Sequence, residues 1–202
     1  MFTTLRNIGQ YFLLLGRVFS IPERKTIFFK QLILEIEKIG LNSLGIVIII
    51  SLFMGAVVTI QATLNLVNPL LPSYLIGLAT RDSLILEFSP TMIALILAGK
   101  VGSNVASEIG SMRVTEQIDA LEIMGINSAS FLILPKIIAA IFFFPLLIIM
   151  SMGVGMIGAW AGGLSSNVTT ADFMYGLTYQ FQPFYITYAV VKTIFFAFII
   201  FF

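Results

Sequence analysis

The sequence has 202 residues, of which 58% are hydrophobic and 10% are charged, with a net charge of +1. Soluble domains carry about 25% charged residues, so a soluble core of this size could not bury the excess of apolar side chains. The near-neutral charge excludes a nucleic-acid-binding surface, and the lack of cysteine and histidine excludes disulfides, thiolate chemistry and imidazole catalysis. We therefore expect an all-α integral membrane protein, because a bilayer accepts apolar side chains all around a helix.

Residues 1–40 mix bulky apolar residues with cations. The cations are Arg6, Arg17, Arg24, Lys25, Lys30 and Lys38. This mixture is typical of an amphipathic helix in the membrane interface, and Pro22 predicts a break in it. A soluble helical tail is the alternative. We expect 1–40 to be an interfacial segment and 41–202 to be the transmembrane domain.

The first two spans follow this segment. Leu41 to Ala62 contains no ionisable residue and reaches ~33 Å as a helix, which is long enough to cross a bilayer. Asparagines and prolines between Asn65 and Ser73 then predict a turn. The second span is less apolar, and Ser89-Pro90 resembles a helix start, so we expect regular helix from there to Ser111.

Two further spans complete the expected four. The third covers 131–164, includes Pro145, and is long enough to tilt or kink. We expect a loop at 167–183 and a fourth span at 184–202. Because the sequence ends in apolar residues without a polar tail, we expect the protein to continue beyond Phe202.

The distribution of Lys and Arg predicts the orientation. The N-terminal segment has six cations, the 62–89 region has only Arg81, the 99–136 region has three, and the 165–183 loop has none. Loops rich in Lys and Arg stay in the cytoplasm. The N-terminus and the loop at 108–130 are therefore expected to be cytoplasmic.

Small residues recur every fourth position in two spans, where they allow helix backbones to approach closely in lipid. We expect helix packing at Gly99, Gly102, Ser103, Ala106, Gly110, Gly155, Gly158 and Gly162. Packing within one subunit is the simpler interpretation of each row. The functional interpretation is that these faces slide or separate.

The stretch VTEQIDALEIMG at 114–125 has the pattern of a short amphipathic helix, which Thr115 would begin and Gly125 would end. Its apolar residues fall at helical spacing, and three acidic residues make a stripe without an intervening base. A solvated face is the simplest interpretation, but the apolar stripe is also suited to docking on a partner. The docking residues are expected to be Glu116, Gln117, Asp119, Leu121, Glu122 and Met124.

The region EFSPTMIALILAGKVGSNVASEIGSMRVTEQIDALEIMGINSASFLILPKIIAA, residues 87–140, resembles the signature region of the MlaE permease family. Weaker similarity covers GAVVTIQ at 55–61 and the glycine-rich third span. Two positions depart from the family pattern, Leu86 and Lys100, where many members have arginine. The family also has a fifth helix, which these 202 residues do not contain.

The resemblance implies the permease subunit of an ABC transporter that moves phospholipids between the inner and outer membranes. It implies a homodimer in the inner membrane, joined to a separate cytoplasmic ATPase through 114–125. Further implied partners are a periplasmic ring of MCE-domain proteins and often a small STAS-domain protein, and membrane lipids would meet a cavity lined by Gly55, Val58 and Gln61.

The sequence itself supports a separate motor. Its one Gly-Lys pair, Gly99-Lys100, lies in no phosphate-binding loop, because Ala94 stands at the first glycine position and Val101 replaces the Ser or Thr. We therefore expect no enzyme activity and no cofactor in this chain, with ATP and Mg bound by the partner.

An intramembrane charge pair between Glu87 and Lys192 is also expected, since both belong to the outer half of the membrane and an unpaired charge is costly there. Snorkelling of Lys192 to the interface, with Glu87 in water, is the alternative. The same charges suit an ion-coupled secondary transporter, which is one rival function, and a passive membrane scaffold is another.

Overall fold

The structure is a computed structural model that describes residues 2–19, 25–66, 71–165 and 168–201. Every regular element within these ranges is helical, as the composition predicts. The elements are α1 (Phe2–Val18), α2 (Lys25–Ile36), η1 (Glu37–Leu41), α3 (Asn42–Asn65), α4 (Tyr74–Ser83), η2 (Leu84–Met92), α5 (Ile93–Val114), α6 (Gln117–Ile123), α7 (Ser128–Leu132), α8 (Leu134–Ser165), α9 (Thr170–Thr178) and α10 (Phe184–Phe201), where η1 and η2 are π-helical.

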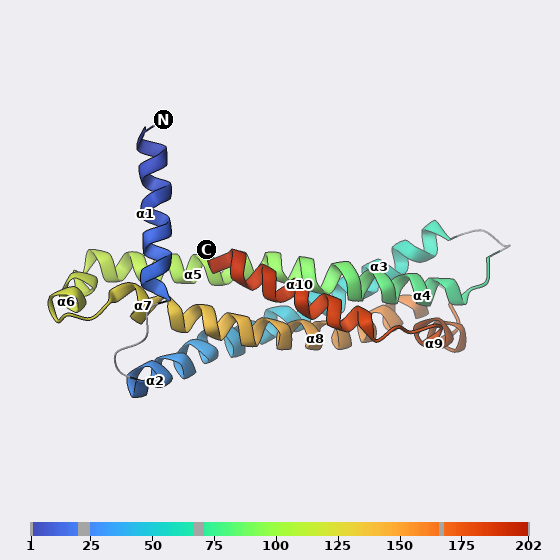
Figure 1. The fold of residues 1–202 in the computed structure, drawn as a ribbon. Coiled ribbons are helices and arrows are strands. Elements are labelled where there is room, and N and C mark those ends of the chain that lie inside the picture. The colour runs from blue at the N-terminus through green and yellow to red at the C-terminus, as the bar shows by residue number, and fades with distance from the viewer. Residues whose placement is uncertain (1, 20–24, 67–70, 166–167, 202) are drawn as a thin grey trace.

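Four helical stretches form a bundle, and each is long and apolar enough to cross a membrane. They are Ile27–Asn65, Tyr74–Val114, Ser128–Ser165 and Phe184–Phe201. Figure 1 shows them running side by side, with α6 and α7 at one end and α9 at the other. We call these the α6 end and the α9 end. The prediction of an all-α membrane fold with four spanning helices is confirmed.

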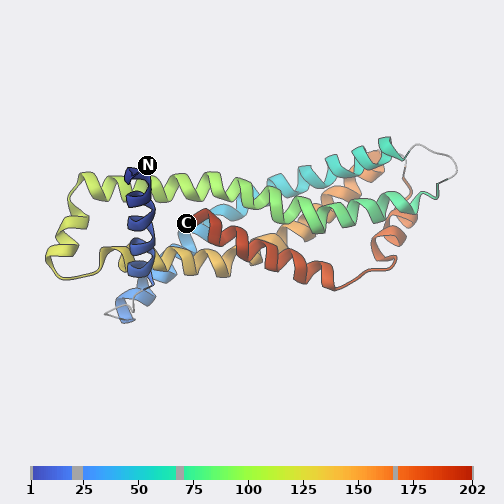
Figure 2. The same cartoon turned by 45° about the horizontal axis from the view of Figure 1, so that its top comes forward.

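Helix α1 does not run with the bundle. Figure 1 shows it projecting from the bundle, roughly perpendicular to the long helices, with its C-terminal end close to α7, and Figure 2 shows the same helix turned toward the viewer. Val18 is buried in a cluster with Leu134 and Ile137 of α8, and the Asn127 side chain donates a hydrogen bond of 3.0 Å to the Arg17 carbonyl. A helix across the spanning helices lies parallel to the membrane, which is the orientation expected of an interfacial helix. Pro22 falls outside the described residues.

The first long helix starts earlier than expected. It runs from α2 through the π-helical η1 into α3 without a break, so residues before Leu41 are part of the same helix. At the junction, a Cβ on Gly40 would lie 2.4 Å from the Phe143 ring of α8. Glycine therefore lets the π-helical turn pack directly against that ring, and the turn shifts the helix register without ending the helix.

The second long helix also starts earlier, at Tyr74, and it continues to Val114. The prediction that Ser89-Pro90 begins this helix is wrong, since both residues are buried inside η2. Proline lacks an N–H and clashes with the carbonyl four residues before it in an α-helix. The wider π-helical turn relieves that clash, so the proline lies within the helix and does not begin it.

Helices α3 and α8 make the closest contact of the bundle. A Cβ on Gly158 would lie 2.0 Å from the carbonyl oxygen of Leu52, and one on Gly55 would lie 1.9 Å from that of Gly155. The Ser51 hydroxyl donates to Ser151 across the same interface, at 2.8 Å. The second small-residue row therefore lies along this contact, and a Cβ on Gly162 would lie 2.6 Å from the Ala56 carbonyl oxygen.

The first small-residue row behaves differently. A Cβ on Gly99, Gly102 or Gly110 would meet nothing within 4 Å, and both Ser103 and Ala106 are exposed. Within the described part of the chain, this face of α5 packs against no other helix. The prediction of helix packing at this row is not met inside one subunit.

The predicted loop at 167–183 contains a helix, so that prediction is wrong. Thr169 caps α9, because its hydroxyl accepts a hydrogen bond of 3.3 Å from the Asp172 N–H. Helix α9 packs closely on α4, where a Cβ on Gly176 would lie 2.1 Å from the Tyr74 carbonyl oxygen. The fourth span, α10, matches its predicted range.

Candidate functional site

The predicted docking residues, from Glu116 to Met124, lie in the connection from α5 to α7, and we call them the docking segment. Its helix is shorter than expected, because α5 runs to Val114 and α6 begins only at Gln117. Thr115 follows the end of α5, and its hydroxyl donates to the Ser111 carbonyl at 2.8 Å. Glu116 then takes a left-handed conformation with a φ of 56°, and α6 begins at Gln117. Gly125, with a φ of 76°, follows the end of α6, as the sequence predicts. The prediction that Thr115 begins this helix is wrong, because α6 begins at Gln117.

The three acidic residues of this segment have different surroundings. Glu116 is exposed. Asp119 accepts from the Arg113 guanidinium at 3.2 Å, and Glu122 accepts from the Ser128 hydroxyl at 2.8 Å. The expected stripe therefore has a base beside it, since Arg113 reaches Asp119 from the last turn of α5.

The apolar residues of the docking segment also differ in exposure. Leu121 is half-buried, whereas Met124 is exposed and Ile123 is 87% exposed. Ile123 is not among the predicted docking residues, because the sequence pattern predicts one continuous helix from Val114. The left-handed residue at Glu116 separates α5 from α6 and changes which side chains share a face.

The predicted pair between Glu87 and Lys192 is present as a contact. The Lys192 ammonium lies 2.9 Å from a Glu87 carboxylate oxygen and also donates to the Leu86 carbonyl at 3.1 Å. The lysine side chain is 19% exposed and that of the glutamate 65%, so the lysine is the more enclosed partner.

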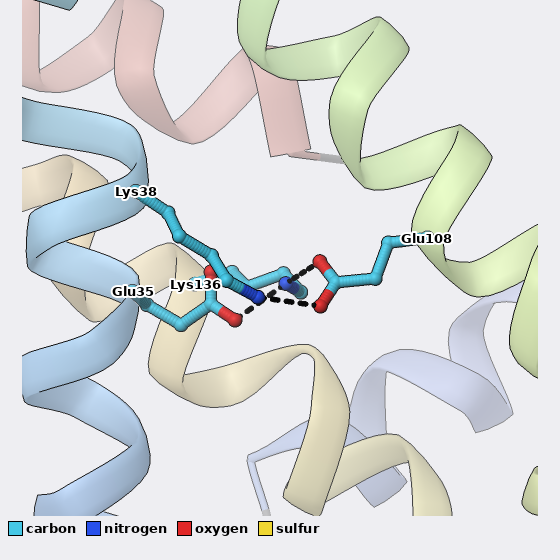
Figure 3. Close-up of polar contacts among 4 residues, drawn as sticks. All are labelled: Glu35, Lys38, Glu108 and Lys136. Atoms are coloured by element: carbon cyan, nitrogen blue, oxygen red, sulfur yellow. Dashed lines mark hydrogen bonds and ion pairs between the residues drawn. The ribbon is translucent and has the colours of Figure 1, made fainter. Parts of the chain in front are cut away.

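A second ion cluster, which the sequence analysis missed, lies at the α6 end (Figure 3). The Lys136 ammonium lies 2.6 Å from Glu35 of α2 and 2.5 Å from Glu108 of α5. The other oxygen of Glu108 accepts from Lys38 at 2.9 Å. The side chains of Lys136 and Glu35 are 3% and 5% exposed. We call these four residues the ion cluster.

A sequence signal for part of the ion cluster exists. Glu35 lies between leucine and isoleucine, and Lys136 lies in an apolar stretch at the start of α8. An ionisable residue on an apolar face predicts a buried partner. The partners are 101 residues apart, so the chain order alone does not pair them.

The expected cavity residues do not share one environment. Gly55 lies against the α8 backbone and Val58 is buried, whereas Gln61 is exposed. The prediction that Gly55 and Val58 line a lipid cavity does not fit this structure, because both residues face the interior of this chain.

The fold and these contacts define a polytopic membrane protein with an exposed helical segment at one end of its bundle. A sequence model of the family described as Permease MlaE matches residues 32–202. The chain therefore belongs to the MlaE permease family.

Individual relatives agree with this assignment. A probable ABC transporter permease protein of Rickettsia bellii is 31% identical over 96% of this chain and 75% of its own length. The intermembrane phospholipid transport system permease protein MlaE of Haemophilus influenzae is 31% identical over 76% of this chain and 57% of its length. The chloroplastic protein TRIGALACTOSYLDIACYLGLYCEROL 1 of Arabidopsis thaliana is 31% identical over 75% and 41%.

Proposed function

We propose that this permease moves phospholipids between the inner and outer membranes, driven by ATP hydrolysis on a separate subunit that docks at Glu116–Met124. The observation that carries the coupling is the docking segment, which exposes Ile123 and Met124 at the α6 end. Exposed apolar side chains rimmed by charges suit a protein partner. The relative from Haemophilus influenzae is named for phospholipid transport, which supports the substrate class.

The proposed orientation has the α6 end in the cytoplasm and the protein in the inner membrane. Helix α1 and the Lys- and Arg-rich segments all lie at this end, as the positive-inside rule requires. ATP and Mg would then bind to the cytoplasmic partner.

The proposed assembly is a homodimer with periplasmic MCE-domain partners and, in some complexes, a STAS-domain protein. The open face of α5, where Gly99, Gly102 and Gly110 meet no neighbour, is suited to close approach by a second helix. Gln61 remains the candidate lipid-facing residue of α3, and the Glu87–Lys192 pair is the candidate polar site among the spans.

Reconstitution of the complex tests the proposal. The full-length permease and its ATPase are placed in donor vesicles that contain labelled phospholipid, and transfer to acceptor vesicles is measured. We expect transfer to require ATP and to continue without a proton or sodium gradient. Transfer that needs a gradient and ignores ATP would establish an ion-coupled transporter. No transfer, with the partners still bound, would establish a scaffold.

A further inference from the structure

The α6-end half of α5 stands apart from the rest of the bundle. Four of its residues are exposed: Ser103, Ala106, Ser107 and Gly110. Between this half of α5 and the α2–α8 pair lie two cavities, of about 210 and 390 Å³. All four residues of the ion cluster line the first cavity, and all except Lys38 line the second. Apolar packing is therefore sparse here, whereas α3 and α8 are in direct backbone contact.

Glu108 is the residue that crosses this gap. One carboxylate oxygen binds Lys136 of α8 and the other binds Lys38 of η1, so a single side chain of α5 joins two elements (Figure 3). Two turns earlier on the same face of α5, the Lys100 ammonium donates to the Asn42 carbonyl at the start of α3. The contacts that hold this half of α5 are therefore largely polar.

The arrangement permits Glu108 to separate without leaving a buried charge alone. Lys136 has two carboxylate partners, and Glu35 on α2 would still neutralise it if α5 moved away. Glu108 is the more exposed partner, with 35% of its side chain accessible, and would enter water. A buried charge that loses every partner is strongly destabilising, and this geometry avoids that outcome.

We propose that the Glu108–Lys136 contact is a releasable latch that links the docking segment to the spanning helices, an inference that rests on the proposed ATPase coupling. Lys136 is the positioning residue. With the latch closed, α5 holds α6 in the position seen here. With it open, α5 and the docking segment move relative to α2 and α8.

Glu108→Ala tests the latch in the full complex with its ATPase. The variant keeps the Glu35–Lys136 pair, so the protein is expected to fold. We expect the ATPase to bind normally, while phospholipid moved per ATP hydrolysed falls about tenfold, a factor typical of coupling between sites. Ser107→Ala, one residue earlier on the exposed face, is the matched control and keeps the wild-type ratio. A wild-type ratio in Glu108→Ala would overturn the latch.

A second variant separates positioning from stability. Glu35→Gln with Lys136→Met removes both buried charges together, and such replacement is often neutral for stability. The double variant is expected to keep the wild-type unfolding temperature but to lose coupling. Glu35→Gln alone keeps the closed contact, but opening it would leave Lys136 without a carboxylate, so coupling is expected to fall in this variant too. Normal coupling in a folded double variant would show that Lys136 has no positioning role.

The movement itself is measurable because the 202 residues contain no cysteine. Gln31→Cys with Ser111→Cys places thiols on the α2 and α5 walls of the 390 Å³ cavity. Gln31→Cys with Phe131→Cys borders the same cavity without involving α5 and serves as control. We expect a short bis-maleimide, which forms a thioether with each of two cysteines, to join the first pair less when ADP and vanadate trap the ATPase, with the control unchanged. Equal joining in both states would refute the movement.

The two proposals fail in different ways. If the wild-type complex moves no phospholipid with ATP, the proposed function is wrong, and the cross-linking still reports whether α5 moves with nucleotide. If the wild-type complex transports and both latch variants remain coupled, only the latch is wrong.

Discussion

The two ends of the bundle are built differently. At the α9 end, α4 and α9 touch through glycines, and Arg81, which is 2% exposed, donates to the carbonyls of Leu177 and Tyr179 at 2.9 and 2.7 Å. At the α6 end, α5 is separated from its neighbours by cavities and joined to them by the ion cluster. Close backbone contact permits little relative movement, whereas ion pairs between separated helices can break and re-form.

The largest difference in stability between the two ends is expected when a glycine at each end is replaced by alanine, which adds one methyl group. Gly176→Ala places a Cβ against the Tyr74 carbonyl oxygen and should lower the free energy of unfolding by about 3 kcal/mol. Gly110→Ala at the α6 end meets open space within one subunit, so in the detergent-solubilised monomer it should raise the free energy of unfolding by about 0.5–1 kcal/mol, through helix propensity. Unfolding in detergent measures both. Equal effects would show that the two ends are equally packed.

The arginines provide the next comparison. Arg81→Met removes a buried guanidinium from two carbonyls and from Asp82, and should cost about 2–3 kcal/mol. Arg113→Met breaks only the exposed pair with Asp119 and should change the free energy of unfolding by less than about 1 kcal/mol. A stable Arg81→Met variant would remove the polar support for a rigid α9 end.

The Glu87–Lys192 pair lies between the spans and should have a smaller effect on stability. A double-mutant cycle with Glu87→Ala and Lys192→Ala is expected to give a coupling energy of about 1 kcal/mol, since the glutamate is largely exposed. Transport should fall in each single variant and recover in part in Glu87→Lys with Lys192→Glu. Purely additive losses would mean that the two side chains act independently.

The smallest effect on stability is expected at the docking segment. Glu116→Lys with Glu122→Lys changes one exposed carboxylate and one that only accepts from Ser128, so unfolding should shift by less than about 0.5 kcal/mol. Binding of the ATPase, measured by co-purification, should nevertheless weaken, because charge complementarity governs association. If the double variant binds the ATPase as well as the wild type does, the docking surface lies elsewhere on the permease.

Hydropathy predicted the four spans because lipid requires ~20 apolar residues per crossing whatever the tertiary structure. Proline was less informative: Pro90 fits equally well at a helix start and within a π-helical turn, and only the neighbouring helices determine which occurs. Likewise, the sequence predicts a loop where α9 lies, because its nine residues, between Asn167 and Pro183, are too few to show a clear helical periodicity.

The candidate sites also differ in how far the sequence predicts them. The short helix within 114–125 and the Glu87–Lys192 contact could be predicted, because each depends on charge or pattern at positions whose depth the spans fix. The ion cluster could not, because it joins α2, α5 and α8 through three-dimensional packing. The left-handed turn at Glu116 was also missed, since no residue at that position requires it.

The second long helix also has the geometry of a lever. Its π-helical stretch, η2, lies between α4, which is fixed at the α9 end, and α5. From Met92 to Glu108 is sixteen residues, or ~24 Å of helix at 1.5 Å per residue. If η2 is the fulcrum, a swing of ~10° carries Glu108 through ~4 Å and α6, farther along the arm, through ~6 Å. A small angular change at mid-helix would therefore be enough to separate Glu108 from Lys136.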